Sequence, residues 1–335
     1  MSLLLTCRVI IGDYEFDRLA DFEMESSWKN LGDTATLKMF GFVQVLEPGQ
    51  DAAAGGTTTR LEDLISVGDA VEVWLGYDGE NRKEFQGYVA EIKLTVPFEV
   101  RLEDEYFHLK RTRVNRTWKK PTLKSLLADL LPKAHLSKSI PDMKMDSFRA
   151  DRTTVAGVLK KLKEDYPGLC AYFRDGVLFV GLTYTEFTST SRVDGAEALY
   201  SFQLNVVTDN LSYQRKEDVR IKAKVVAMHA NGKKTTTEAG DVDGAERTIT
   251  LRTETKDKSK LKELAEKELA KFKYDGYSGD LTSFGVPFVL HSGVADLLDE
   301  KHPQRGGRYL VDVVKVSFGT SGFRRVVTLG KRSSY

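Results

Sequence analysis

The chain has 335 residues, 41% of them hydrophobic, so it is long enough to bury large cores and predicts two or three globular domains. Its 50 Lys and Arg against 49 Asp and Glu leave a net charge of +1, which excludes a general attraction to nucleic acid or to an anionic membrane. No apolar run approaches the length that crosses a bilayer, so we predict no membrane anchor.

The N-terminal region predicts short strands. Residues Leu3–Ile11 and Ala35–Val45 are rich in β-branched and aromatic side chains, with a looser strand pattern over Phe16–Trp28. The opening MSLLLTCRVII does not predict a signal peptide, because Arg8 interrupts the apolar run and no basic region precedes it. Residues 47–59 (EPGQDAAAGGTTT) have no apolar period and predict a mobile loop between two strands of one barrel, followed by a helical turn over Arg60–Ile65.

Residues Val67–Arg111 predict an antiparallel meander of three strands, because hydrophobic residues alternate with polar ones on both sides of two breaks. Asp78-Gly79 is a turn signal, and Pro97 cannot donate to a central ladder. Gly87, inside the second strand, predicts a bulge or tight bend that would curve the sheet towards a barrel.

A helical module follows the meander. Thr122 is a candidate N-cap for a leucine-rich helix that ends before Pro132. A second helix is predicted over Thr153–Tyr166, and Asp175-Gly176 predicts a hairpin between two apolar strands. Pro121 to about Leu182 therefore predicts a compact α/β insert.

The strand pattern resumes in the C-terminal third. We predict strands over Val206–Tyr213, Asp218–His229, Arg247–Arg252 and Tyr309–Leu329, with Asn231-Gly232 as a hairpin turn. The strongest helix signal in the chain, at about 259–272, is expected to pack on the outside of a second barrel.

The predicted fold class is mainly β with an α+β insert: two similar antiparallel β-barrels separated by a small α/β module. The predicted domains are 1–115, containing the loop 47–66, then the insert 116–200, then 201–335 with its outer helix. The two barrels are predicted as an internal repeat, because a Gly-led meander early in the chain is echoed by one that starts at Gly293. Three such chains would form a ring of six like barrels.

The order barrel, insert, barrel resembles the tail hub proteins of contractile phages, also called late control protein D, and the N-terminal part of the VgrG spikes of type VI secretion. The resemblance is carried by GDAVEVWLGY (68–77), FQGYVAEI (85–92), LEDEYFHLKR (102–111), the hairpin at 166–181 and GGRYLVDVVKVSFGTSGFRRVVTLG (306–330). It covers nearly the whole chain and fits a phage, a prophage or a secretion device alike.

The resemblance implies a homotrimer that joins the sixfold tail tube to the threefold central spike, in a virion baseplate assembled in the bacterial cytoplasm. Its implied partners are the tail tube protein, baseplate wedge proteins and a separate spike protein, since the sequence ends just after the second barrel without a spike stem. Candidate contacts with a neighbouring ring or subunit are Glu47, Arg60, Leu61 and Leu64, all within the loop 47–66.

Other functions have less support in the sequence. The five histidines lack the spacing of metal ligands, and no nucleophile or nucleotide-binding motif occurs, so we predict no catalytic, metal or cofactor site. The alternatives are a cell-wall or carbohydrate-active enzyme using scattered carboxylates, and a β-rich module with an apolar ligand pocket. Glu103, Asp104 and Glu105 form the local acidic cluster, but consecutive strand residues cannot all face one cleft.

The basic run from Lys110 to Lys120, which includes Trp118, is expected to be a solvated connector rather than a sequence-specific nucleic-acid surface. The two cysteines, Cys7 and Cys170, are expected to be buried small apolar residues.

Overall fold

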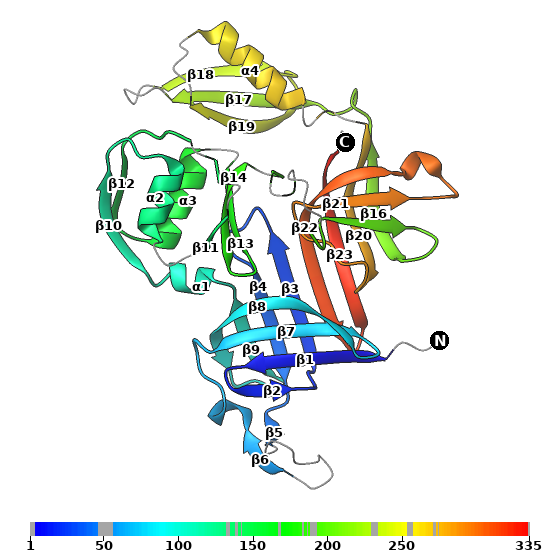
Figure 1. The fold of residues 1–335 in the computed structure, drawn as a ribbon. Helices are drawn as coiled ribbons and strands as arrows, with labels where there is room; N and C mark the ends of the chain where they lie inside the picture. Colours follow the sequence, from blue (N-terminus) through cyan, green and yellow to red (C-terminus); the bar gives the residue numbers. More distant parts are fainter. Residues whose placement is uncertain are drawn as a thin grey trace.

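The computed structural model describes residues 4–45, 56–131, 135–137, 140–141, 143–166, 169–182, 184–185, 187, 193–228, 234–252, 257–270, 273 and 275–333. Thirteen of its strands form one sheet, ordered β16-β20-β23-β22-β3-β4-β9-β8-β7-β1-β2, with β21 also paired to β22 and β15 paired to β21. The sheet curves into two barrel-like halves, one below and one to the right in Figure 1. The predicted fold class, two antiparallel barrels with an α/β insert, is confirmed.

The first barrel contains β1 to β4 and β7 to β9, and its strands alternate buried and exposed side chains as a half-buried sheet requires. A separate hairpin of β5 and β6 carries the short helix η2 at its end. The bounds are β1 Leu5–Ile11, β2 Tyr14–Phe16, β3 Asp21–Ser27, β4 Thr34–Met39, β5 Phe42–Val45, β6 Thr57–Arg60, η2 Leu61–Asp63, β7 Ala70–Tyr77, β8 Glu80–Lys93 and β9 Phe98–Glu103.

The second barrel is built on a meander of β21, β22 and β23 that has the same antiparallel order as β7, β8 and β9. β20 and β16 continue the sheet beyond β23, and β15 pairs in parallel with β21, so residues 197–201 lie with this barrel although 116–200 was predicted as insert. The bounds are β15 Glu197–Ser201, β16 Val206–Gln214, β20 Gly276–Phe284, β21 Val294–Leu298, η4 Pro303–Arg305, β22 Gly307–Gly319 and β23 Gly322–Arg332.

The two barrels are joined directly, because β22 pairs with β3 over seven residues, from Val313 opposite Ser27 to Gly319 opposite Asp21. One hydrophobic core runs through both halves, with Phe22 and Val100 on one side and Val316 and Val327 on the other. The barrels therefore share a sheet and a core rather than only a linker.

The insert has its own core, formed by two helices against two small sheets. The Thr122 side chain accepts a hydrogen bond from the Ser125 amide in a capping box, which confirms the predicted start of the first long helix. Asp175 and Gly176 both have positive φ, as the predicted two-residue turn requires. The bounds are α1 Tyr106–Leu109, β10 Arg113–Trp118, α2 Leu123–Leu130, β11 His135–Leu136, β12 Phe148–Thr154, α3 Val155–Asp165, β13 Leu169–Arg174 and β14 Val177–Leu182.

The predicted outer helix exists as α4 (Lys258–Ala270), but its predicted packing partner was wrong. It lies on a separate three-stranded sheet of β17 (Ile221–Met228), β18 (Lys234–Gly240) and β19 (Ala245–Arg252), where Ala265 and Leu269 bury against Ile221. This small unit lies apart from the second barrel, at the top of Figure 1. The predicted Asn231-Gly232 turn lies outside the described residues. No helix in the described part of the chain is both long and apolar enough to cross a bilayer.

Gly87 was predicted to mark a bulge or a tight bend, and the bulges of β8 lie at other residues. The irregularities of β8 lie at Glu84, opposite β7, and at Ala90, opposite β9. Gly87 sits between them, where a Cβ would overlap the carbonyl oxygen of Glu103. The position needs glycine because the backbones of β8 and β9 approach closely there.

We therefore expect Gly87→Ala to lower the stability of the first barrel by about 2 kcal/mol or more, because backbone must move to admit the methyl group. The measurement is the midpoint of thermal unfolding. The matched control is Gly41→Ala, since a Cβ at Gly41 meets no atom within 4 Å. Equal midpoints for the two variants would contradict the assigned role of Gly87.

Candidate functional site at the junction of the barrels

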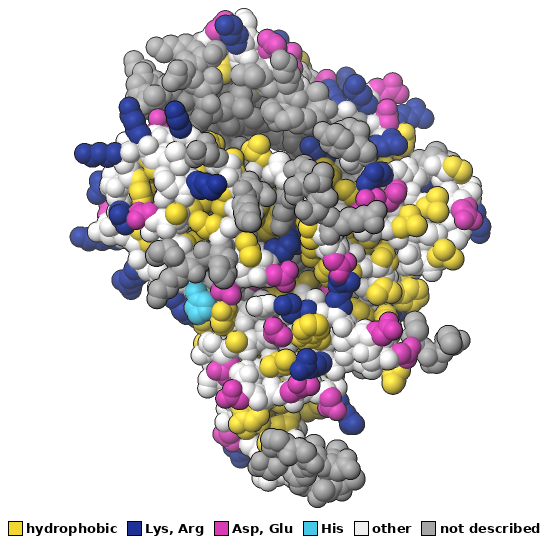
Figure 2. Space-filling model, viewed as in Figure 1, with side chains coloured by type: hydrophobic (Ala, Val, Ile, Leu, Met, Phe, Trp, Pro, Cys, Tyr) yellow, Lys and Arg dark blue, Asp and Glu magenta, His cyan; other side chains and the backbone are white. Residues whose placement is uncertain are grey.

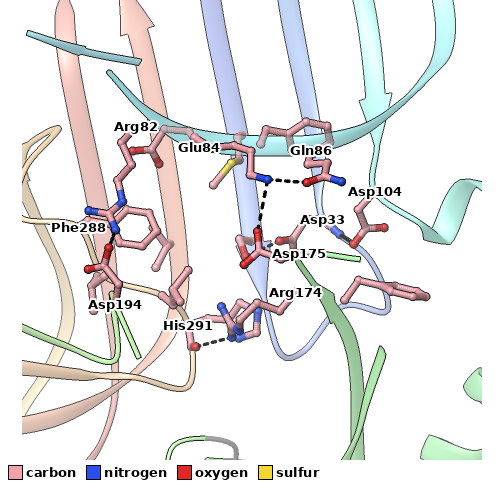
Figure 3. Close-up of a pocket in the computed structure, with 18 of the residues that line it drawn as sticks. Asp33, Arg82, Glu84, Gln86, Asp104, Arg174, Asp175, Asp194, Phe288 and His291 are labelled. Atoms are coloured by element: carbon pink, nitrogen blue, oxygen red, sulfur yellow. Dashed lines mark hydrogen bonds and ion pairs between the residues drawn. The ribbon is translucent and has the colours of Figure 1, made fainter. Parts of the chain in front are cut away.

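A cleft of about 600 Å³ lies where the two barrels and the insert meet. Strand β8 forms one wall, the β13–β14 turn of the insert forms the second, and the segment before β21 forms the third (Figure 3). Ionisable side chains from different elements line it: Asp33, Arg82, Lys83, Glu84, Asp104, Glu105, Arg174, Asp175, Asp194, His291 and Arg325.

A buried ion pair connects the two barrels at this cleft. Arg325 Nη2 on β23 lies 2.6 Å from Glu84 Oε1 on β8, and both side chains are 1% exposed. Val73 pairs with Phe85 and Trp74 with Lys83, so Glu84 is the extra residue of a β-bulge. By simple alternation from the buried Phe85 its side chain would point outward, but the bulge re-aims it towards Arg325.

The groups around this pair satisfy its polar atoms only in part. Arg325 Nε also donates to the Gly285 carbonyl at 3.1 Å, and the Phe288 ring lies near both the Arg82 and the Arg325 guanidinium groups. Burial raises the pKa of Glu84, although Arg325 opposes this shift. Among the described residues, Glu84 Oε2 and Arg325 Nη1 have no hydrogen-bond partner.

Two further carboxyl groups lie at the side of the cleft nearest the insert. Asp33 accepts hydrogen bonds from the Ser26 hydroxyl at 2.6 Å and the Ser27 amide at 3.3 Å. Asp104 accepts from the amides of Asp33 and Tyr106, both at 2.9 Å. Burial raises the pKa of Asp33 to about 6, and burial together with the nearby Asp33 raises the pKa of Asp104.

His291 is a buried histidine of the third wall. Burial lowers its pKa well below the ordinary value, so the ring is neutral at pH 7. Its backbone carbonyl accepts a hydrogen bond from Arg174 Nη2 at 3.1 Å, which ties the insert hairpin to the second barrel (Figure 3). Lys83 lies 3.8 Å from Asp175 and Arg82 pairs with Asp194, so polar contacts cross the cleft in several places.

The arrangement is one of cross-links between parts of the fold. The described residues include no group of three or more His, Cys, Asp or Glu side chains that could hold a metal ion. Both oxygens of Asp104 and both of Asp33 accept local hydrogen bonds that fix the β3–β4 and β9–α1 turns. These contacts hold the two barrels and the insert together at the cleft.

The predicted contact residues are in different environments. Arg60 is exposed and pairs with Glu62, whereas Leu61 is fully buried in the barrel core and Leu64 packs against that core. Glu47 lies outside the described residues. Leu61 and Leu64 therefore anchor the segment, and Arg60 is the described candidate whose side chain is available to a partner.

Two exposed aromatic residues beside Arg60 were not predicted from the sequence. Phe40 is 56% and Phe42 is 66% exposed, and Phe42 pairs directly with Arg60 in the β5–β6 hairpin. Figure 2 shows hydrophobic side chains at this end of the molecule. The signal was present in the sequence, since two aromatics follow the buried strand β4 immediately before a polar loop.

The charged clusters noted in the sequence have structural partners. Glu103 lies 2.5 Å from Lys110, and Glu105 accepts from the Tyr88 hydroxyl at 3.1 Å. Trp118 is buried, and its indole nitrogen donates to Asp129 at 2.6 Å. The tryptophan of the basic run is thus part of the insert core rather than an exposed stacking platform.

The raised pKa of Asp33 predicts a pH effect. The folded protein holds a proton on Asp33 up to about pH 6, whereas the unfolded chain releases it near pH 4, so this residue costs stability as pH rises through that window. We expect Asp33→Asn to flatten the fall in the unfolding midpoint between pH 4 and 7 and to raise the midpoint at pH 8. The exposed Asp13→Asn is the control, and parallel curves for all three proteins would contradict the assignment.

No protein-family model and no curated protein matches the chain. Among solved structures, the fold is similar to a tail protein from Neisseria meningitidis, with a TM-score of 0.67, 13% identity, and coverage of 98% of this chain and 97% of that one. It is also similar to the 43 kDa tail protein of prophage MuSo2 from Shewanella oneidensis, with a TM-score of 0.61, 12% identity and 97% coverage of each chain. The E. coli c3393 protein, described as a component of the type VI secretion system with structural similarity to the phage T4 tail proteins gp27 and gp5, has a TM-score of 0.56, 11% identity, and coverage of 98% and 77%. The resemblance carried by the sequence motifs is thus confirmed at the level of the fold, which this chain shares over nearly its whole length with phage tail proteins and a type VI secretion component.

Proposed function

We propose that this protein is a structural hub of a contractile tail or injection baseplate, which trimerises into a pseudo-sixfold ring and joins the tail tube to the central spike. The observation that carries the proposal is the pair of similar barrels in one continuous sheet. Three copies would present six like barrels to a sixfold tube and a threefold face to a spike. The similarity of the whole fold to tail proteins supports this role.

The β5–β6 hairpin is the part of the first barrel best suited to contact a neighbouring ring or subunit. It projects from the barrel at the end opposite the insert (Figure 1). It presents Phe40, Phe42 and Arg60, and exposed aromatic and Arg side chains are the residue types that dominate protein interfaces. We propose the tail tube protein as its partner, with a separate spike protein and baseplate wedge proteins bound elsewhere in a virion tail assembled in the bacterial cytoplasm.

A cell-wall or carbohydrate-active enzyme is the alternative, and the raised pKa values of Asp33 and Asp104 are the observation in its favour. The hydrogen bonds to these carboxyl groups weigh against it. Their oxygens already accept bonds from local amides and a hydroxyl, so they stabilise turns. The structural role accounts for the same geometry without a reaction.

The ring predicts a defined mass. We expect light scattering to give three times the 37.6 kDa chain mass at high protein concentration or with the spike protein present, and electron microscopy to show a ring with six similar densities. A monomer mass under both conditions would overturn the proposed hub.

The proposed role of the β5–β6 hairpin predicts that substitutions in it weaken binding to the tail tube protein without destabilising the fold. We expect Phe42→Ser combined with Arg60→Glu to weaken binding to the tail tube protein by about tenfold or more, while the unfolding midpoint stays within a few degrees of wild type, because both side chains are exposed. Leu94→Ser is the matched control, since Leu94 is 69% exposed in the β8–β9 connection. Equal affinities for all three proteins would exclude the hairpin as the contact.

A further inference from the structure

Besides the shared hydrophobic core, two polar contacts join the barrels, one along the paired strands and one away from them. The first is the β3–β22 ladder, a single line of paired strands. Neighbouring strands of a sheet can twist relative to each other. The β3–β22 ladder alone therefore fixes where the two barrels meet but defines the angle between them only weakly. A second contact away from that line is needed to set the angle.

The second contact joins β7 and β8 of the first barrel to β23 and its neighbours in the second. Tyr77 donates its hydroxyl to the Phe323 carbonyl at 3.1 Å, and the two rings pack with centroids 5.6 Å apart. Glu84 and Arg325 form the buried ion pair next to this contact, although 241 residues separate them in the chain. In the sheet order β7 and β8 are separated from β3 by β4 and β9, so this contact lies off the ladder.

The buried ion pair is expected to add little to the free energy of unfolding and to act by specifying the relative position of the two barrels. Burying two charges costs several kcal/mol per ion, and their attraction offsets this only when the remaining polar atoms are bonded. Here Glu84 Oε2 and Arg325 Nη1 have no partner within the described structure. Replacing a buried ion pair by apolar residues of similar volume is often neutral or stabilising, whereas the hydrogen bond between Glu84 and Arg325 forms only when the two strands hold these groups 2.6 Å apart.

We propose that Glu84 and Arg325 are positioning residues that fix the angle between the two barrels and so determine whether three chains close into a ring. The inference rests on the proposed hub for its consequence, but the angle itself is a property of one chain. Neighbouring groups support the same geometry: the Gly285 carbonyl accepts from Arg325 Nε, and the Phe288 ring lies near both the Arg82 and the Arg325 guanidinium groups.

The test replaces the pair with apolar residues of similar size, Glu84→Leu with Arg325→Met. Spin labels on exposed positions of the two barrels, Asp13→Cys and Lys301→Cys, report the angle as a distance distribution in a background with Cys7→Ser and Cys170→Ala. We expect the unfolding midpoint to change by less than about 5 °C, the distance distribution to broaden, and the trimer association constant to fall by about tenfold or more.

The matched control is a second ion pair between the same two barrels. Lys315 on β22 lies 3.1 Å from Glu25 on β3, on the ladder itself, and both side chains are largely exposed. Glu25→Gln with Lys315→Met should leave the distance distribution unchanged. If the Glu84 and Arg325 double variant does not fold, Arg325→Lys keeps the charge but loses the planar fork, and it should broaden the distribution in a folded protein.

The outcomes separate the two proposals. An unchanged distance distribution in the folded Glu84 and Arg325 variants would overturn the positioning role, whether or not rings form. A broadened distribution in a protein whose wild type never trimerises would support the positioning of the barrels and count against the hub. A broadened distribution with normal ring formation would show that ring closure does not depend on this pair.

Discussion

The pairing of β3 with β22 is the constraint on which the rest of the structure depends. It converts two meanders from opposite ends of the chain into one sheet and allows a single hydrophobic core to run through both barrels. The cleft and its ion pair follow from it, because both are built from residues of the two halves, and the insert hairpin contacts Lys83 of the first barrel and His291 of the second. Nothing local in β3 or β22 specifies this pairing, since each strand has an ordinary alternation of buried and exposed residues.

Local features of the fold could be predicted from the sequence because their causes are local. The Asp78-Gly79 and Asp175-Gly176 turns have the positive φ values that their residue types tolerate, and Thr122 caps its helix through a side chain three residues from its partner. Long-range pairing has no such local cause. The strands β17, β18 and β19 have the same pattern as barrel strands, so their separation into a sheet under α4 could not be inferred from alternation.

At the cleft between the barrels, one of the two residues of the ion pair could be predicted from local pattern and the other could not. Arg325 could have been found, because it occupies the inward phase of β23 set by Phe323 and Val327, and a charged residue at a buried position needs a partner. Glu84 could not, because the alternation from Phe85 places it outward and only the bulge turns it inward. A bulge depends on the relative register of two strands, which a single sequence does not display.

The β3–β22 ladder also has a consequence for the order in which the protein forms during synthesis. Strand β3 is synthesised well before its partner β22, because most of the described chain lies between them. At typical rates of about 5–20 residues per second, the open edge of β3 waits on the order of tens of seconds for β22. An unpaired strand edge is a template for wrong pairing. When several copies are made on one messenger RNA, β22 of another copy can compete for the open edge of β3. The connection that makes the finished molecule continuous therefore forms late in synthesis, while the edge of β3 is open to pairing with other strands.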